Sequence, residues 1–132
     1  MKGGFLMIVN IKRLDDEAVV PTKGSDYAAG LDLYARITTD TKAKRVSAGQ
    51  TEKIGTGIAV EIPNGYFGAI FARSGLATKQ GLRPANCVGV IDSDYRGEII
   101  VAIHSDSDLG STIRDGDRIG AIQLPPSPPQ AR

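Results

Sequence analysis

Apolar and polar residues alternate along much of the chain, and turn-forming residues separate the alternating runs. Ile54, Ile58, Val60 and Ile62 occupy even positions of one run, which ends in a Pro-Asn-Gly sequence. Such alternation is typical of a half-buried strand, because successive side chains of a strand point to opposite faces. This run therefore predicts a strand and a turn. Residues 66–72 predict the return strand of a hairpin, since Asn-Gly tolerates positive φ.

Similar runs elsewhere predict further strands. They occupy residues 7–14, 88–91, 98–104 and 112–124, and the last run holds one or two strands around an Asp-Gly-Asp turn. Only residues 75–80 have even a brief helical pattern. Many short strands at this spacing favour a barrel or jelly roll, which removes or protects the sheet edges. We therefore predict an all-β fold, a jelly-roll-like distorted barrel of short strands with one short helical turn.

The domain organisation follows from length and from the last residues. A chain of 132 residues can bury one hydrophobic core but not two, so residues 1–124 are expected to form a single β domain. Residues 125–132 read PPSPPQAR. Proline lacks the backbone donor that a strand ladder needs, so we expect these residues to leave the sheet as an extended proline-rich tail.

Composition and charge narrow the classes of function. The 16 Lys and Arg residues nearly balance the 15 Asp and Glu residues, so no overall basic field favours nucleic acid. No apolar run approaches the roughly 20 residues of a membrane helix, and the apolar start turns polar too early for a signal peptide. Cys87, the single cysteine, lies in an apolar run and is expected to be a small core residue. We expect a cytoplasmic protein that binds neither membrane nor nucleic acid.

Residues 86–97 (NCVGVIDSDYRG) place an acid at the end of an apolar strand. Asp92 is expected to be partly desolvated there, and its carboxylate could deprotonate a water held beside an electrophile. The strand backbones on either side offer donors and acceptors that could read the edge of a small base. From the residue types alone, a plain turn beside a solvated Arg96 is the favoured interpretation.

Other segments offer weaker candidates. Arg73, Ser74 and Gly75 could grip phosphate through a guanidinium, a hydroxyl and backbone amides, although such a triplet is more often an ordinary loop. Asp32 and Asp117 each lie near a glycine at a strand entrance. Each could be a turn cap, the partner of an arginine, or an outer-shell ligand of magnesium, and the turn cap is favoured. No zinc spacing, Walker loop or Gly-x-Ser-x-Gly elbow supports another mechanism.

Four segments occur in order along the chain: residues 28–34 (AAGLDLY), 73–77 (RSGLA), 89–97 (GVIDSDYRG) and 116–119 (GDRI). Together they resemble the motif series of the homotrimeric dUTPase (deoxyuridine 5′-triphosphate nucleotidohydrolase) family. The third is specific by itself, and the order makes the others specific. The resemblance implies the dUTPase fold and a hydrolase that cuts dUTP to dUMP and pyrophosphate by water attack at the α-phosphorus. Such an enzyme supplies dUMP for thymidylate synthesis and keeps uracil out of DNA.

The resemblance also implies how the site is built. Asp92 would activate the attacking water, and Tyr95 would lie under the deoxyribose and exclude UTP. Asp32 would lie, through water, in the outer shell of a Mg²⁺ ion bound chiefly by the triphosphate. A homotrimer would share each active site between subunits. The implied substrate-binding residues are Arg73, Ser74 and Gly75 for the triphosphate, and Asn86, Val90, Ile91 and Ile100 for uracil.

The chain departs from the family pattern in two places. The glutamine that normally follows the fourth-motif arginine by three residues is replaced by Ala121, and Gln123 follows instead. Side chains alternate, so Gln123 would face the same side, displaced by roughly 6 to 7 Å, and we keep it as a substrate-binding candidate. The family's glycine-rich C-terminal arm is missing, so we expect a preformed pocket with lowered turnover.

Two alternatives stay open. A dUTPase-fold protein could sense the nucleotide and regulate a partner with weak hydrolysis, which the missing arm favours. A dCTP deaminase shares the fold, but it normally shows a longer serine- and arginine-rich second motif and a glutamate base, neither of which is found here.

Overall fold

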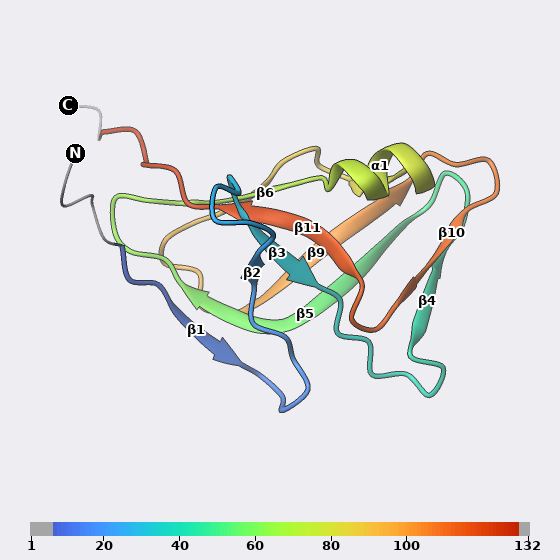
Figure 1. The fold of residues 1–132 in the computed structure, drawn as a ribbon, viewed down its shortest axis with the longest axis horizontal. Coiled ribbons are helices and arrows are strands. Elements are labelled where there is room, and N and C mark those ends of the chain that lie inside the picture. Colours follow the sequence, from blue (N-terminus) through green and yellow to red (C-terminus); the bar gives the residue numbers. More distant parts are fainter. Residues whose placement is uncertain (1–6, 130–132) are drawn as a thin grey trace.

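The computed structural model describes residues 7–129, and antiparallel strands dominate it (Figure 1). One sheet contains, in spatial order, β2 (Thr22–Lys23), β3 (Leu31–Tyr34), β11 (Arg118–Gln123), β6 (Gly68–Phe71) and β8 (Gly89–Ile91). The other contains β1 (Asn10–Arg13), β5 (Thr51–Glu61), β9 (Glu98–Ser105) and β7 (Leu82–Pro84), while β4 (Ala43–Val46) pairs with β10 (Ser111–Arg114). The predicted all-β fold is confirmed.

The core lies where the two larger sheets bury their apolar side chains together. Leu33 and Ile119 come from the five-stranded sheet, Ile54 and Ile99 from the four-stranded one, and all four belong to one buried cluster. Each is no more than 1% exposed. Burial of this kind stabilises the fold because apolar surface leaves water, so the position of each sheet is fixed by contacts with the other.

The single helix, α1, covers Ser74–Gln80 and begins one residue before the predicted helical turn. Gly81 ends it in the left-handed conformation, with φ of 67°, and its N–H donates to the carbonyl of Leu76. Glycine is favoured there because a Cβ is strained at positive φ. The helix follows β6 directly, so it holds the residues after that strand at the rim of the sheet (Figure 1). No helix within residues 7–129 is long and apolar enough to cross a membrane.

The predicted hairpin of residues 54–72 is wrong, although both strands exist. β5 pairs with β1 and β9, whereas β6 pairs with β11 and β8 in the other sheet. The Pro-Asn-Gly turn forms, with Gly65 at φ of 87°. The chain then crosses between the sheets, because the backbone after the turn bonds to the proline-rich segment instead of to β5.

The proline-rich segment follows β11, which ends at Gln123, and its first residues bond to the turn that precedes β6. Phe67 N–H donates to the carbonyl of Pro125 at 3.1 Å, and Ser127 N–H donates to the carbonyl of Gly65 at 2.7 Å. Proline lacks a donor, but its carbonyl still accepts, so one edge of the segment can pair. An isolated bridge between Tyr66 and Pro126 results. Residues 130–132 of the predicted tail lie outside the described residues.

Candidate active site

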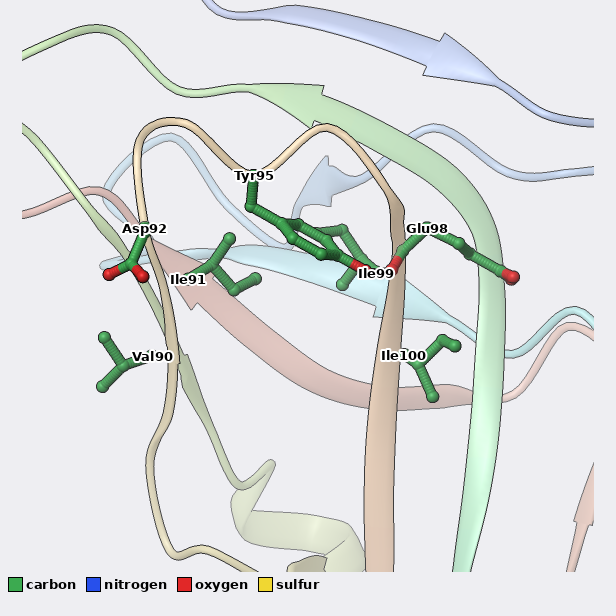
Figure 2. A pocket seen from close by; sticks show the side chains of 7 residues that line it. All are labelled: Val90, Ile91, Asp92, Tyr95, Glu98, Ile99 and Ile100. Carbon is green, nitrogen blue, oxygen red and sulfur yellow. Dashed lines mark hydrogen bonds between the residues drawn. The ribbon is translucent and has the colours of Figure 1, made fainter.

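A cavity of about 240 Å³ opens between β8 and the start of β9. Its walls are Val90, Ile91, Asp92, Tyr95, Glu98, Ile99 and Ile100 (Figure 2). The two strands border a common cavity because they are not paired: β8 bonds to β6, while β9 bonds to β5 and β7. The structure therefore brings together five of the predicted site residues, and each sheet supplies one wall.

Tyr95 crosses from the turn toward the start of β9 (Figure 2). Its hydroxyl donates to the carbonyl of Glu98 at 2.7 Å. The ring passes close over Gly97, where an added Cβ would lie 2.6 Å from the hydroxyl oxygen. Any larger residue at position 97 would displace the ring, so the glycine and the carbonyl together determine where the aromatic face lies.

The turn that carries Asp92 is held by its own backbone. Tyr95 N–H donates to the carbonyl of Asp92 at 3.1 Å. Arg96 Nη1 donates to the carbonyl of Ser93 at 2.6 Å and more weakly to that of Tyr95 at 3.2 Å. The arginine thus fastens the turn and is not merely a solvated neighbour. These bonds fix the direction in which β8 ends and hence the position of the carboxylate.

Asp92 is exposed in the single chain, so the expected partial desolvation is corrected. The physical reason is that β8 is the edge strand of its sheet and the residue follows its last position. Figure 2 shows the carboxylate on the same side of β8 as Val90, and Ile91 on the opposite side, as strand alternation requires. A ligand or a second chain would be needed to remove the carboxylate from water.

Asn86 and Cys87 lie in the turn before β8, outside the residues that line the cavity. Val88 N–H donates to the carbonyl of Asn86 at 2.7 Å. Cys87 is exposed, which corrects the expectation of a core residue. It has φ of 64°, and a tight turn with one residue in the left-handed region directs its side chain outward despite the apolar sequence around it.

A second cavity, of about 450 Å³, lies over β3, β11 and the segment that joins β6 to α1. It brings together four more predicted residues, Asp32, Arg73, Ser74 and Gln123. Gly75, also predicted, is the next residue in the first turn of α1. Ala121 and Gln123 both line this cavity, which confirms that the displaced glutamine faces the same side as the alanine that precedes it by two residues.

Asp32 is the partner of two arginines, which corrects the favoured turn-cap interpretation. Its Oδ1 lies 3.5 Å from Nε of Arg73, and its Oδ2 lies 3.6 Å from Nη1 of Arg118. The side chain of Asp32 is 15% exposed, so the pairs are partly shielded from water. Asp117, by contrast, is a turn cap as expected, because its Oδ2 accepts the Arg114 N–H at 2.8 Å.

Arg118 is a cavity residue that sequence reasoning missed as an individual candidate. The available signal was its place in the fourth motif, two residues after Gly116. It lies on β11 opposite Tyr34 of β3, next to a register shift between Arg118 and Gly120. Two guanidinium groups, one hydroxyl and one amide therefore line one cavity, and both guanidinium groups pair with its carboxylate. Such donors are suited to polyanions.

Metal binding by the protein alone finds little support in residues 7–129. Among them no group of three or more His, Cys, Asp and Glu side chains could enclose an ion. In the larger cavity Asp32 is the one carboxylate among the lining residues. A metal held here would need most of its ligands from a bound molecule.

Comparison with known proteins assigns the fold and motifs to a family. A family profile described as dUTPase matches residues 16–124. The chain belongs to the dUTPase family. A deoxyuridine 5′-triphosphate nucleotidohydrolase of Desulfitobacterium hafniense is 45% identical over 115 residues, which are 86% of this chain and 74% of that relative. The corresponding protein of Corynebacterium glutamicum is 42% identical over 120 residues, 90% of this chain and 77% of that relative.

Solved dUTPase structures have the same architecture. The dUTPase of Streptococcus mutans superposes with a TM-score of 0.81 at 26% identity, over 94% of this chain and 98% of that one. A phage phi11 dUTPase of Staphylococcus aureus superposes with a TM-score of 0.81 at 21% identity, over 96% of this chain and 95% of that one. The predicted dUTPase fold is thus confirmed.

Proposed function

We propose that this chain hydrolyses dUTP to dUMP and pyrophosphate by attack of water at the α-phosphorus. The observation that carries the proposal is the cavity between β8 and β9, in which an acid, an aromatic ring and a sheet edge meet. These three features match the three parts of the reaction: a base for water, a surface for the sugar and a backbone edge for uracil. Membership of the dUTPase family supports the same conclusion.

Uracil is recognised by the backbone of β8 near Val90 and Ile91, with Ile100 on the opposite wall and Asn86 beside the entrance. The edge position of β8 supports this role, because a strand that pairs on one side can offer its other side to a ligand. Cytosine carries a donor where uracil carries an acceptor, so it would leave a polar group unpaired. A site of this kind can reject the wrong base by about 10⁴-fold.

Asp92 positions and activates the attacking water as a general base. Substrate bound in the cavity would cover the exposed carboxylate and bring the α-phosphorus close to it. Tyr95 lies under the deoxyribose and leaves no room for a 2′-hydroxyl. Its hydrogen bond to the carbonyl of Glu98 supports that role, because the bond keeps the ring from rotating out of the cavity.

The triphosphate is bound by Arg73, Ser74 and Gly75, with Gln123 and the newly identified Arg118. The convergence of four of these residues on the larger cavity supports the assignment. Asp32 keeps the two guanidinium groups in place before the substrate arrives. Positive groups fixed in advance stabilise charge that builds up on the leaving pyrophosphate without reorganisation during the reaction.

Mg²⁺ is the proposed cofactor, and the residues fit an ion held mainly by the substrate. Mg²⁺ is commonly bound through one or two carboxylates together with substrate phosphates, and Asp32 is one carboxylate in a cavity suited to phosphates. Asp32 would therefore lie in the outer shell of the ion, through water. When bound, Mg²⁺ neutralises phosphate charge and polarises the phosphoryl oxygens.

A homotrimer with shared active sites is part of the proposal. No residue lines both the cavity that contains Asp92 and the cavity that contains Arg73. Bound dUTP must nevertheless contact both the general base and the phosphate-binding residues. In a site assembled from two or more copies of the chain, the cavity that contains Asp92 in one subunit would adjoin the cavity that contains Arg73 in another. Closed symmetric assembly of identical chains is the usual way to repeat such a contact.

The test is a dUTP hydrolysis assay with Mg²⁺ that follows dUMP and pyrophosphate. Asp92→Asn should lower turnover by about 10² to 10⁴-fold, because it removes the general base while keeping the side-chain shape. Asp94→Asn is the matched control: it lies two residues away in the same turn, is exposed, and does not line the cavity. Full turnover in Asp92→Asn would overturn the assignment of the base. Tight dUTP binding without turnover in the wild type would favour a nucleotide-sensing protein instead.

A further inference from the structure

The strand β5 carries an irregularity directly opposite the start of β9. Gly55 pairs with Ile100, and the next registered pair is Ala59 with Glu98. Three residues of β5, at positions 56–58, therefore face the single residue Ile99. Bulges of this kind bend the strand and redirect nearby groups, and they are frequent beside functional sites.

The side chain of Glu98 fills this irregularity. Its Oε2 accepts the Gly57 N–H at 3.0 Å. A Cβ added at Gly55 would lie 2.5 Å from the same oxygen, so the carboxylate occupies space that only glycine leaves open. Figure 2 shows Glu98 pointing toward β5 and away from Asp92. The carboxylate is thus directed into the scaffold, although the residue lines the cavity.

The backbone of the same residue supports the sugar-binding ring. The carbonyl of Glu98 accepts the Tyr95 hydroxyl at 2.7 Å. The next carbonyl, that of Ile99, accepts the buried hydroxyl of Thr56 at 2.6 Å. Two donors of the bulge, the Gly57 N–H and the Thr56 hydroxyl, therefore hold the first two residues of β9. The first of these residues, Glu98, carries the acceptor for Tyr95.

We propose that Glu98 is a positioning residue for sugar selectivity: its carboxylate anchors the start of β9 to the bulge of β5, so that its carbonyl fixes the Tyr95 ring against the deoxyribose. The inference rests on the proposed function, because it gives Tyr95 its role in excluding UTP. It adds a determinant of selectivity that touches neither the sugar nor the reacting phosphate. Glu98 acts through the hydrogen bond of another residue.

The first test compares kcat/KM for dUTP and UTP in variants from both strands. Glu98→Ala removes the anchor and should lower the dUTP-to-UTP ratio by about tenfold, the change expected from one lost hydrogen bond. Gly55→Ala should have the same effect from the opposite strand, because the added Cβ expels the carboxylate; Gly55 has no positive φ that alanine would strain. Glu98→Gln keeps an oxygen acceptor for Gly57 and should retain the wild-type ratio.

A double-mutant cycle separates positioning from general damage. Tyr95→Phe removes the hydroxyl and should lower the ratio by a similar factor. If Glu98 acts through that hydroxyl, Glu98→Ala combined with Tyr95→Phe should be no worse than either change alone. If the losses in the dUTP-to-UTP ratio multiply in the double variant, the proposal is overturned. A wild-type ratio in folded Glu98→Ala and Gly55→Ala proteins would also overturn it.

A measurement without turnover distinguishes this inference from the proposed function. In protein labelled with ¹³C-tyrosine, the ring signal of Tyr95, assigned with Tyr95→Phe, should shift in Glu98→Ala and Gly55→Ala but not in Glu98→Gln. An unchanged ring signal in both disruptive variants would overturn the positioning role. If the wild type fails to hydrolyse dUTP but the ring signal shifts as expected, the proposed function fails while the link between Glu98 and Tyr95 stands.

Discussion

Asp32 of β3 and Arg73, which follows β6 and precedes α1, form an ion pair with 3.5 Å between Oδ1 and Nε, and β3 and β6 flank β11 on opposite sides. Asp32→Asn keeps the shape but removes the charge that orients Arg73 and Arg118. We expect the KM for dUTP to rise about tenfold, the size of one lost charge-assisted contact. Stability should fall by no more than about 1 kcal/mol, because the arginines remain partly exposed.

Steady-state kinetics with dUTP and thermal unfolding check this expectation together. Asp108→Asn is a suitable control, because Asp108 is exposed and lines neither cavity. An unchanged KM in Asp32→Asn would show that the arginines hold their positions without the carboxylate. A large loss of stability with unchanged KM would assign Asp32 to the scaffold instead.

Acid should destabilise the fold through Asp15. The hydrogen bond from the Arg36 guanidinium holds the pKa of Asp15 below its ordinary value and raises the pKa of Arg36. The unfolded chain then binds a proton more readily than the folded one, so the stabilisation is present above about pH 4 and is lost as the pH falls through the folded-state pKa. Thermal unfolding between neutral and acid pH should show the fall.

Asp15→Asn should make the same profile flatter, because asparagine does not titrate. The Arg83 side chain lowers the pKa of the Asp106 carboxylate in the same direction, so Asp106 supplies a residual slope. Asp106→Asn should therefore flatten the profile further in combination. A wild-type slope in the Asp15→Asn variant would contradict the role of the Arg36 pair.

Two glycines with nearly equal φ separate the cost of backbone strain from the cost of side-chain crowding. Gly57 has φ of 70° and Gly49 has φ of 71°. A Cβ at Gly57 would lie 2.9 Å from Cβ of Ala18 and 3.0 Å from Cγ of Arg36, whereas one at Gly49 meets nothing within 4 Å. Gly49→Ala should cost about 1 kcal/mol for the backbone conformation, and Gly57→Ala about 1 to 3 kcal/mol more for overpacking. Equal unfolding midpoints would refute the crowding.

The hydroxyl of Thr56 should be important for stability. The residue is 1% exposed, and Thr56→Val would leave the carbonyl of Ile99 without its 2.6 Å donor. An unpaired buried carbonyl costs about 1 to 3 kcal/mol. Thr38→Val, at an exposed position, should change stability by less than about 0.5 kcal/mol. Chemical denaturation of both variants measures the difference, and equal effects would count against the hydrogen bond.

The sequence predicted the strands with clear alternation and missed those without it. The run through Ile54 and Val60 became β5, whereas β4 and β7 are short and lack a continuous alternating pattern. Pairing partners were beyond the sequence, because they depend on distant strands. The hairpin prediction failed for this reason: a local turn signal says that the chain reverses, but not which sheet it joins afterwards.

The sequence predicted individual residues of the site but not the contacts between them. The order of the four motifs along the chain identified Arg73 and Asp92, and the structure places these residues in separate cavities. The partners of Asp32 were left open because three roles suit a carboxylate at a strand entrance, and only the fold brings Arg73 and Arg118 to it. Glu98 had no motif signal, since its role depends on a bulge in another strand.

The cavity that contains Asp92 has one wall in each sheet, so its width depends on how the two sheets pack against each other. Ile91 and Ile99, on the two walls, contact the same buried cluster that holds the sheets at their spacing. A cavity lined by a single sheet would keep its dimensions if the two sheets shifted relative to each other. A cavity lined by both sheets would change its width. Under the proposed function, substitutions in the core that change the spacing of the sheets should therefore change which nucleobases the cavity accepts.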